Sequence, residues 1–122
     1  MTSDEKQITA KLVHFFSDVT AEIDVLAIAL KGANRRAARS SSGNGQEVGL
    51  RGFKHRFAFK AANDWQAIGV LVDDEHHGVL RYRLDDSEYV LMTDDGQHTI
   101  VDDAATLVRA LTADLAAAEG WR

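Results

Sequence analysis

The sequence of 122 residues contains neither cysteine nor proline. Without cysteine the chain forms no disulfide bond and no metal site built on thiolates. Without proline it has no rigid polyproline segment and no element boundary marked by that residue. Long apolar runs are missing too, because the longest, Val25 to Leu30, is far shorter than the roughly 20 residues that cross a membrane. We therefore expect a soluble, cytoplasmic protein without a membrane partner.

Positive charge is scarce and unevenly distributed. The chain has 14 Lys or Arg against 19 Asp or Glu, a net charge of −5, which argues against a non-specific nucleic-acid binder. Residues 31–60 nevertheless hold eight Lys or Arg and one acid, Glu47, which leaves six basic and eighteen acidic residues elsewhere. Such a chain either pairs its basic segment with its own acidic turns or offers each to a different partner.

A helical pattern is present at the start of the chain. Thr2 and Glu5 have the spacing of a capping box, and Gly32 is a candidate stop signal. A helix over residues 4–31 measures about 42 Å at 1.5 Å per residue, so it either overhangs a compact domain or is interrupted. Its apolar stripe has spacings of three and four: Ile8, Leu12, Phe15, Phe16, Val19, Ile23, Leu26 and Leu30.

The second half of this helix is apolar on more than one side. Between Ile23 and Leu30 only Asp24 is polar, so the apolar surface is wider than one sheet face requires. Two interpretations remain open. Either this end of the helix is deeply buried, or Val25, Ile28 and Ala29 pack against a second copy of the chain and form a homodimer.

The rest of the chain predicts an α+β fold. Residues 33–49 are small, polar and basic, which indicates a flexible loop. From residue 50 to 101 apolar runs alternate with short turns, the pattern of a four-stranded antiparallel β-meander whose first strand covers residues 50–60. Asp102 or Asp103 caps a second helix over residues 103–118, and Gly120 is its candidate stop signal. We therefore predict a single two-layer domain, residues 1–122, in the order helix, four strands, helix.

Histidine and aspartate residues gather in two of the predicted turns, residues 73–78 and 94–99. Strand direction reverses at each turn, so both turns lie at the same end of the sheet. His76, His77 and His98, with the aspartates beside them, are residue types that bind metal ions or transfer protons. The two turns lie about 10 Å apart, however, and no metal-binding spacing or nucleotide-binding motif occurs. We predict no metal site, no cofactor and no catalytic residue.

The strongest candidate site is the sheet face opposite the apolar side chains. Alternation along the strands assigns five cations and two aromatic residues to this face: Lys54, Arg56, Lys60, Trp65, Arg81, Arg83 and Tyr89. The predicted loop adds Arg35, Arg36 and Arg39. These residue types anchor protein interfaces, and they also build platforms for single-stranded nucleic acid. Alternatively, a helix covers this face, or Arg81 and Arg83 pair with Glu88 and Asp85.

These observations favour a non-enzymatic protein-interaction module, of the inhibitor, chaperone or adaptor kind. The basic sheet face and the Arg-rich loop would bind an acidic protein partner, and the first helix would form the homodimer. Two alternatives come from other classes. One is a protein that binds single-stranded nucleic acid, which is the less favoured partner, and the other is a metal-dependent enzyme that uses the His and Asp turn cluster.

Overall fold

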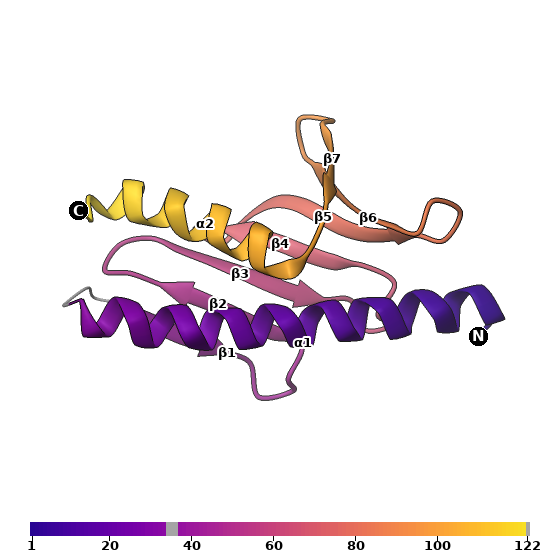
Figure 1. The fold of residues 1–122 in the computed structure, drawn as a ribbon, viewed down its shortest axis with the longest axis horizontal. Helices are drawn as coiled ribbons and strands as arrows, with labels where there is room; N and C mark the ends of the chain where they lie inside the picture. Colours follow the sequence, from indigo (N-terminus) through magenta and orange to yellow (C-terminus); the bar gives the residue numbers. More distant parts are fainter. Residues whose placement is uncertain (34–36, 122) are drawn as a thin grey trace.

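A computed structural model describes residues 1–33 and 37–121 of the chain. The order of elements is helix, seven strands, helix, so the predicted α+β class is confirmed while the predicted strand number of four is wrong. The elements are α1 (Ser3–Gly32), β1 (Ala38–Ser41), β2 (Glu47–Arg51), β3 (Arg56–Ala61), β4 (Ile68–Val72), β5 (Glu75–Arg83), β6 (Glu88–Thr93), β7 (His98–Val101) and α2 (Ala104–Glu119). Figure 1 shows their arrangement.

The sheet is a meander in which each strand pairs antiparallel with the next one along the chain. Three strands were not predicted. The segment 33–49, expected to be a loop, contains β1 and the start of β2, and the expected first strand over residues 50–60 is divided by a turn between β2 and β3. The third addition, β7, follows the turn at residues 94–97. Polar β1 carries no apolar alternation, so its sequence gives no strand signal.

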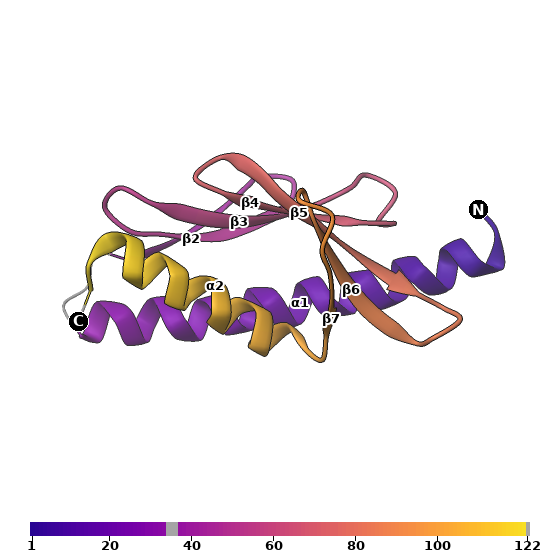
Figure 2. The same cartoon turned by 90° about the horizontal axis from the view of Figure 1, so that it is seen from above.

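Both helices lie on the same face of the sheet, which we call the covered face; the opposite side is the open face. Figure 2 shows α1 and α2 side by side beneath strands β2 to β5, with β6 and β7 twisting down toward them. The core lies between these layers, and it includes Phe59, Leu50, Ile68 and Leu80, each 0% exposed. Hydrophobic burial of this kind is the main driving force for folding.

Helix α1 is continuous over 30 residues, about 45 Å in length. It begins at the predicted capping box, in which the Thr2 hydroxyl accepts a hydrogen bond from the Glu5 N–H. The predicted apolar stripe faces the core: Leu12, Phe15, Phe16, Val19 and Ile23 are buried, and Ile8, Leu26 and Leu30 pack partly against them. The question of an interrupted helix is thus resolved in favour of one long element.

Helix α2 also has the ends predicted for it. The Asp103 carboxylate accepts from the Thr106 N–H at 2.8 Å, which lowers the pKa of Asp103. At the other end Gly120 adopts the left-handed conformation, with φ of 71°, and Trp121 after it packs partly against the core. The last turn of α2 is therefore fixed beside the sheet, which matters for the polar contacts described below.

Candidate functional site: the open face and the turn end of the sheet

The open face can be mapped from the pairing register of the strands. Arg51 lies opposite Arg56, and Lys60 follows four positions later on the same side of β3. In β5 the exposed Arg81 and Arg83 alternate with the buried Leu80 and Tyr82 of the covered face. Five cations from β2, β3 and β5 thus share the open face: Arg51, Arg56, Lys60, Arg81 and Arg83.

Some of these cations are already paired. The Arg56 guanidinium contacts the Asp74 carboxylate and lies 4.0 Å from that of Glu47. Arg83 lies 3.8 Å from Asp86, the acid three residues further along the chain. Within residues 1–33 and 37–121, Arg51, Lys60 and Arg81 have no ion pair with an acid. The predicted alternative had Arg81 and Arg83 pairing with Glu88 and Asp85. Among the described residues Arg83 pairs with Asp86 instead, and Arg81 has no ion pair with an acid.

Apolar side chains separate the cations on the same face. Register places Leu71 beside Ala58, and Val79 beside Met92. Ile100 of β7 lies opposite Val90 and is 59% exposed, and Met92 is 37% exposed. The open face therefore presents an apolar strip with unpaired cations beside it, and no described helix lies over it.

The two aromatic residues predicted on this face lie elsewhere. Trp65 belongs to the loop between β3 and β4, has a positive φ of 55°, and packs edge-on against Phe16 of α1. Tyr89 lies opposite Tyr82 on the covered face, and its ring packs in a tilted arrangement against that of Phe15, with ring centroids 4.7 Å apart. Burial raises the pKa of Tyr89. Both placements correct the prediction, so the open face loses its expected aromatic side chains.

The reason for the error at Tyr89 is that strand β6 is apolar at every central position. All four residues from Tyr89 to Met92 are apolar or aromatic, so either alternate pair suits the core. The sequence therefore cannot show which pair faces the helices. The turn at residues 84–87, where Ser87 has a positive φ of 52°, sets the register instead. Leu91 therefore joins the core, and Val90 and Met92 lie on the open face.

The remaining predicted cations divide into three groups. Lys54 lies in the turn between β2 and β3, not on a strand face. The Arg39 Nε lies 2.6 Å from Asp24 of α1, so this side chain ties β1 to the first helix. Arg35 and Arg36 lie outside the described residues. The predicted Arg-rich loop is thus represented here by Arg39 alone.

Arg51 is absent from the predicted face because the prediction treats residues 50–60 as one strand. Gly52 begins the turn that brings Arg51 opposite Arg56. The outward face of α1 agrees with the prediction of a surplus apolar surface, since Val25 is 61% and Ile28 is 75% exposed and Ala29 is also exposed. The outward side of this helix end is therefore not buried, and self-association through it stays a prediction.

Polar residues gather where three turns meet at one end of the sheet: residues 52–55, 73–74 and 94–97. As expected, the two acidic turns are at the same end, and His76 Nδ1 lies 2.7 Å from Asp94 Oδ1. The turn between β4 and β5 is shorter than predicted, because β5 already starts at Glu75. Asp73 and Asp74 form it with positive φ values of 52° and 68°.

The His55 and Asp73 side chains form a second polar pair at this end. The Nδ1 atom of His55 lies 2.8 Å from Asp73 Oδ2, and the Arg56 N–H donates to Asp73 Oδ1 at 2.9 Å. These two hydrogen bonds hold the pKa of Asp73 below its ordinary value. Beside them lies a cavity of about 120 Å³ with an apolar floor from α2, including Leu111 and Leu115.

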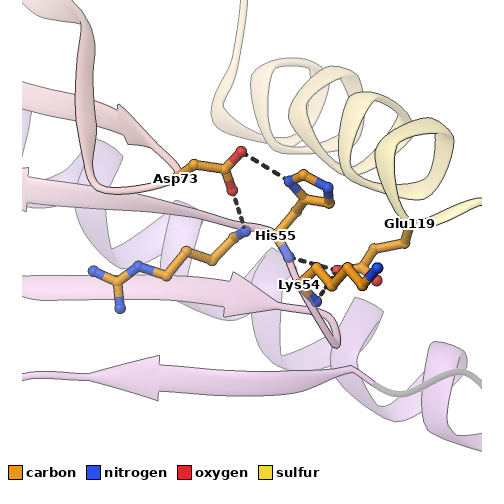
Figure 3. Close-up of polar contacts among 5 residues, drawn as sticks. Lys54, His55, Asp73 and Glu119 are labelled. Atoms are coloured by element: carbon orange, nitrogen blue, oxygen red, sulfur yellow. Dashed lines mark hydrogen bonds and ion pairs between the residues drawn. The ribbon is translucent and has the colours of Figure 1, made fainter.

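Glu119, from the last turn of α2, completes this end of the sheet. Its Oε1 atom accepts hydrogen bonds from the backbone N–H groups of Lys54 and His55, each at 2.6 Å (Figure 3). Desolvation raises the pKa of Glu119, but the backbone hydrogen bonds from His55, Lys54 and Phe53 outweigh it, so that the pKa is lowered overall. Sequence reasoning missed both His55 and Glu119, since neither belongs to a recognisable motif.

Across the described ranges, no group of three or more His, Asp or Glu side chains is arranged to hold a metal ion. Nor does any helix in that part of the chain have the length and apolar character needed to span a bilayer. No protein-family model matches the chain, and comparisons with curated proteins and with solved structures give no significant match.

Proposed function

We propose that the protein is a non-enzymatic interaction module whose open sheet face binds an acidic segment of a partner protein. The observation that supports this most directly is that Arg51, Lys60 and Arg81, which have no ion pair with an acid among the described residues, share the open face with the exposed apolar strip. Apolar contact supplies affinity, and complementary charge selects the partner and speeds association. A partner segment that alternates acidic and apolar residues fits both features.

Binding of single-stranded nucleic acid receives less support. That function needs aromatic rings on which bases stack. In the described strands the aromatic side chains Phe57, Phe59, Tyr82 and Tyr89 all belong to the covered face, where they pack in or against the core. The open face keeps cations suited to phosphates but offers no Phe, Tyr or Trp side chain from these strands.

The test uses a fluorescently labelled peptide of alternating Glu and Leu residues as the probe. Fluorescence anisotropy should show saturable binding to the wild-type protein, weakened roughly tenfold by Arg81→Glu because a like charge then faces the peptide. The matched control is Lys6→Glu, which makes the same change of charge at an exposed position of α1. It should leave the affinity unchanged.

Two results would contradict the proposal. One is equal binding of the peptide to wild type and Arg81→Glu, which would place the peptide elsewhere. The other is tighter binding of a labelled oligothymidylate than of the peptide, with an affinity that falls steeply as salt rises, because this is the behaviour of a nucleic-acid binder.

A further inference from the structure

The turn between β2 and β3 holds a carboxylate in a manner typical of anion-binding sites. Three successive backbone N–H groups, those of Phe53, Lys54 and His55, donate to the Glu119 side chain. Successive backbone N–H groups that converge on one point form a concave site for anions. Here the anion is part of the chain itself, and it comes from 64 residues away along the sequence.

The surroundings of this carboxylate are suited to a larger ligand. A groove of about 470 Å³ lies along the turn and is lined by Ala37, Ala38, Arg51, Gly52, Phe53, Lys54, His55 and Arg56. Its size is within the range of small-molecule sites. Arg51 and Lys54 have no ion pair with an acid among the described residues, and Phe53 is 65% exposed. Positive charge and an apolar ring thus adjoin the three N–H groups.

We propose that the 53–55 backbone cradle and its groove form a binding site for a small organic carboxylate, with Glu119 as the occupant that such a ligand replaces. The groove shares Arg51 and Arg56 with the open face proposed to bind an acidic protein, but the cradle itself lies in the turn between β2 and β3. The ligand's carboxylate takes the position of the Glu119 carboxylate, and its organic body lies in the groove beside Phe53 and Lys54.

The position of Glu119 makes exchange feasible. It is the last residue of α2, and Gly120 with its left-handed backbone follows directly, so the side chain leaves the cradle without disturbing the buried part of the helix. The fit around its carboxylate is close. A Cβ atom at Gly52 would lie 2.6 Å from both Cδ and Oε1 of Glu119, so glycine is needed there for a carboxylate to enter.

The test vacates the cradle by Glu119→Ala and adds sodium acetate, with sodium chloride at equal ionic strength as the reference. The readout is the amide resonances of Phe53, Lys54 and His55 in a ¹H–¹⁵N spectrum. We expect Glu119→Ala to shift these amides and acetate to move them back saturably. In wild type, acetate competes with the Glu119 side chain. The acetate concentration at the midpoint of the titration should therefore be at least roughly tenfold higher than in Glu119→Ala.

Two variants serve as controls. Glu119→Gln keeps an oxygen acceptor of the same length in the cradle, so its response to acetate should resemble that of wild type. The double variant Gly52→Ala with Glu119→Ala fills the space for the carboxylate, and acetate should not move its amides. If Glu119→Ala fails to fold, Glu119→Asp replaces it, because the shorter side chain withdraws the carboxylate while it retains the charge.

Three results would overturn the inference. The first is a folded Glu119→Ala variant whose three amides do not respond to acetate beyond the chloride reference. The second is an equal response of the Gly52→Ala double variant, which would place the acetate elsewhere. The third is a response to inorganic phosphate without one to acetate, which would exclude carboxylates as the ligand class. Arg81→Glu should leave the acetate response unchanged, so failure here and failure of peptide binding are distinguishable.

Discussion

The covered and open faces of the sheet are built from the same strands but from different residues. On β3, the covered face carries Phe57 and Phe59, whose rings meet edge-on with centroids 6.1 Å apart, whereas the open face carries Arg56, Ala58 and Lys60. Covered positions are large because they fill the space beneath two helices. On β3 the open positions are small or charged. The comparison indicates that the covered face of β3 supplies the buried core, while the open face carries its charged side chains.

The largest expected difference in stability is between variants at two adjacent residues of β3. Phe59→Ala should lower the free energy of unfolding by about 3–5 kcal/mol, because Phe59 is fully buried and the substitution leaves a cavity. Lys60→Ala, one position along on the open face, should change it by no more than about 0.5 kcal/mol. Urea denaturation followed by circular dichroism measures both. Similar losses for the two variants would break the distinction between the faces.

Two glycines of the open face should respond differently to substitution by alanine, because the space beside each glycine differs. A Cβ atom at Gly49 would lie 2.3 Å from the Phe57 carbonyl oxygen, so Gly49→Ala should cost about 1–3 kcal/mol. At Gly69 the nearest atom is the Lys60 carbonyl oxygen at an ordinary 3.5 Å. Gly69→Ala should therefore stabilise the strand by about 0.5–1 kcal/mol. Thermal denaturation distinguishes the two, and equal signs would contradict the close approach at Gly49.

A smaller effect is expected at the turn end. Asp73→Asn keeps an acceptor for the Arg56 N–H and a residue that tolerates positive φ, but it removes the carboxylate that pairs with His55. The cost at pH 7 should be below about 1 kcal/mol, because the Asp73 side chain is 45% exposed and water screens the pair.

The dependence of this cost on pH follows from the direction of the pKa shift. The pKa of Asp73 is lower in the folded than in the unfolded chain, so the stabilisation is complete above the unfolded value. It is lost as pH falls through the folded value. Wild type and Asp73→Asn should therefore differ most near neutral pH and converge below about pH 4. Urea denaturation at several pH values checks this, and a difference that grows in acid would contradict it.

The smallest effect on stability is expected on the outward side of α1. Val25→Ser with Ile28→Ser should change the free energy of unfolding by no more than about 0.5 kcal/mol, because both side chains are largely exposed. Its effect on assembly should be larger. We expect light scattering to give a dimer for wild type and a monomer for the double variant, with Val13→Ser as the control. A monomeric wild type at high micromolar concentration would exclude self-association through this surface.

The sequence was sufficient to predict those helices and turns whose residues repeat with a clear period or carry a recognisable capping residue. The stripe and capping box of α1, the Asp103 and Gly120 ends of α2, and the shared end of the two acidic turns were all predictable. It was insufficient where residues suit either of two placements. Residues 89–92 are apolar on both sides of the strand, so either side suits the core. Strand β1 is polar and lies at the edge of the sheet, where burial does not impose an apolar alternation.

The candidate sites show the same division. Arg56, Lys60, Arg81 and Arg83 were placed correctly by alternation, because buried neighbours on the same strand fix their direction. Trp65 was not, since a loop residue with positive φ follows no alternation. Glu119 contacts the turn at residues 52–55, which is distant along the sequence. This contact depends on where α2 ends on the covered face, and no local sequence pattern encodes that position.

The sequential strand order has a consequence for how the chain assembles. Every ladder joins strands that are consecutive along the sequence, so each hairpin closes a short loop at low entropic cost. Low contact order of this kind favours rapid folding. Among the described elements, the packing of α1 with α2 brings together the first and last segments of the sequence. We therefore expect the sheet to form progressively, hairpin by hairpin, and the contact between the two helices to be the step that makes folding cooperative.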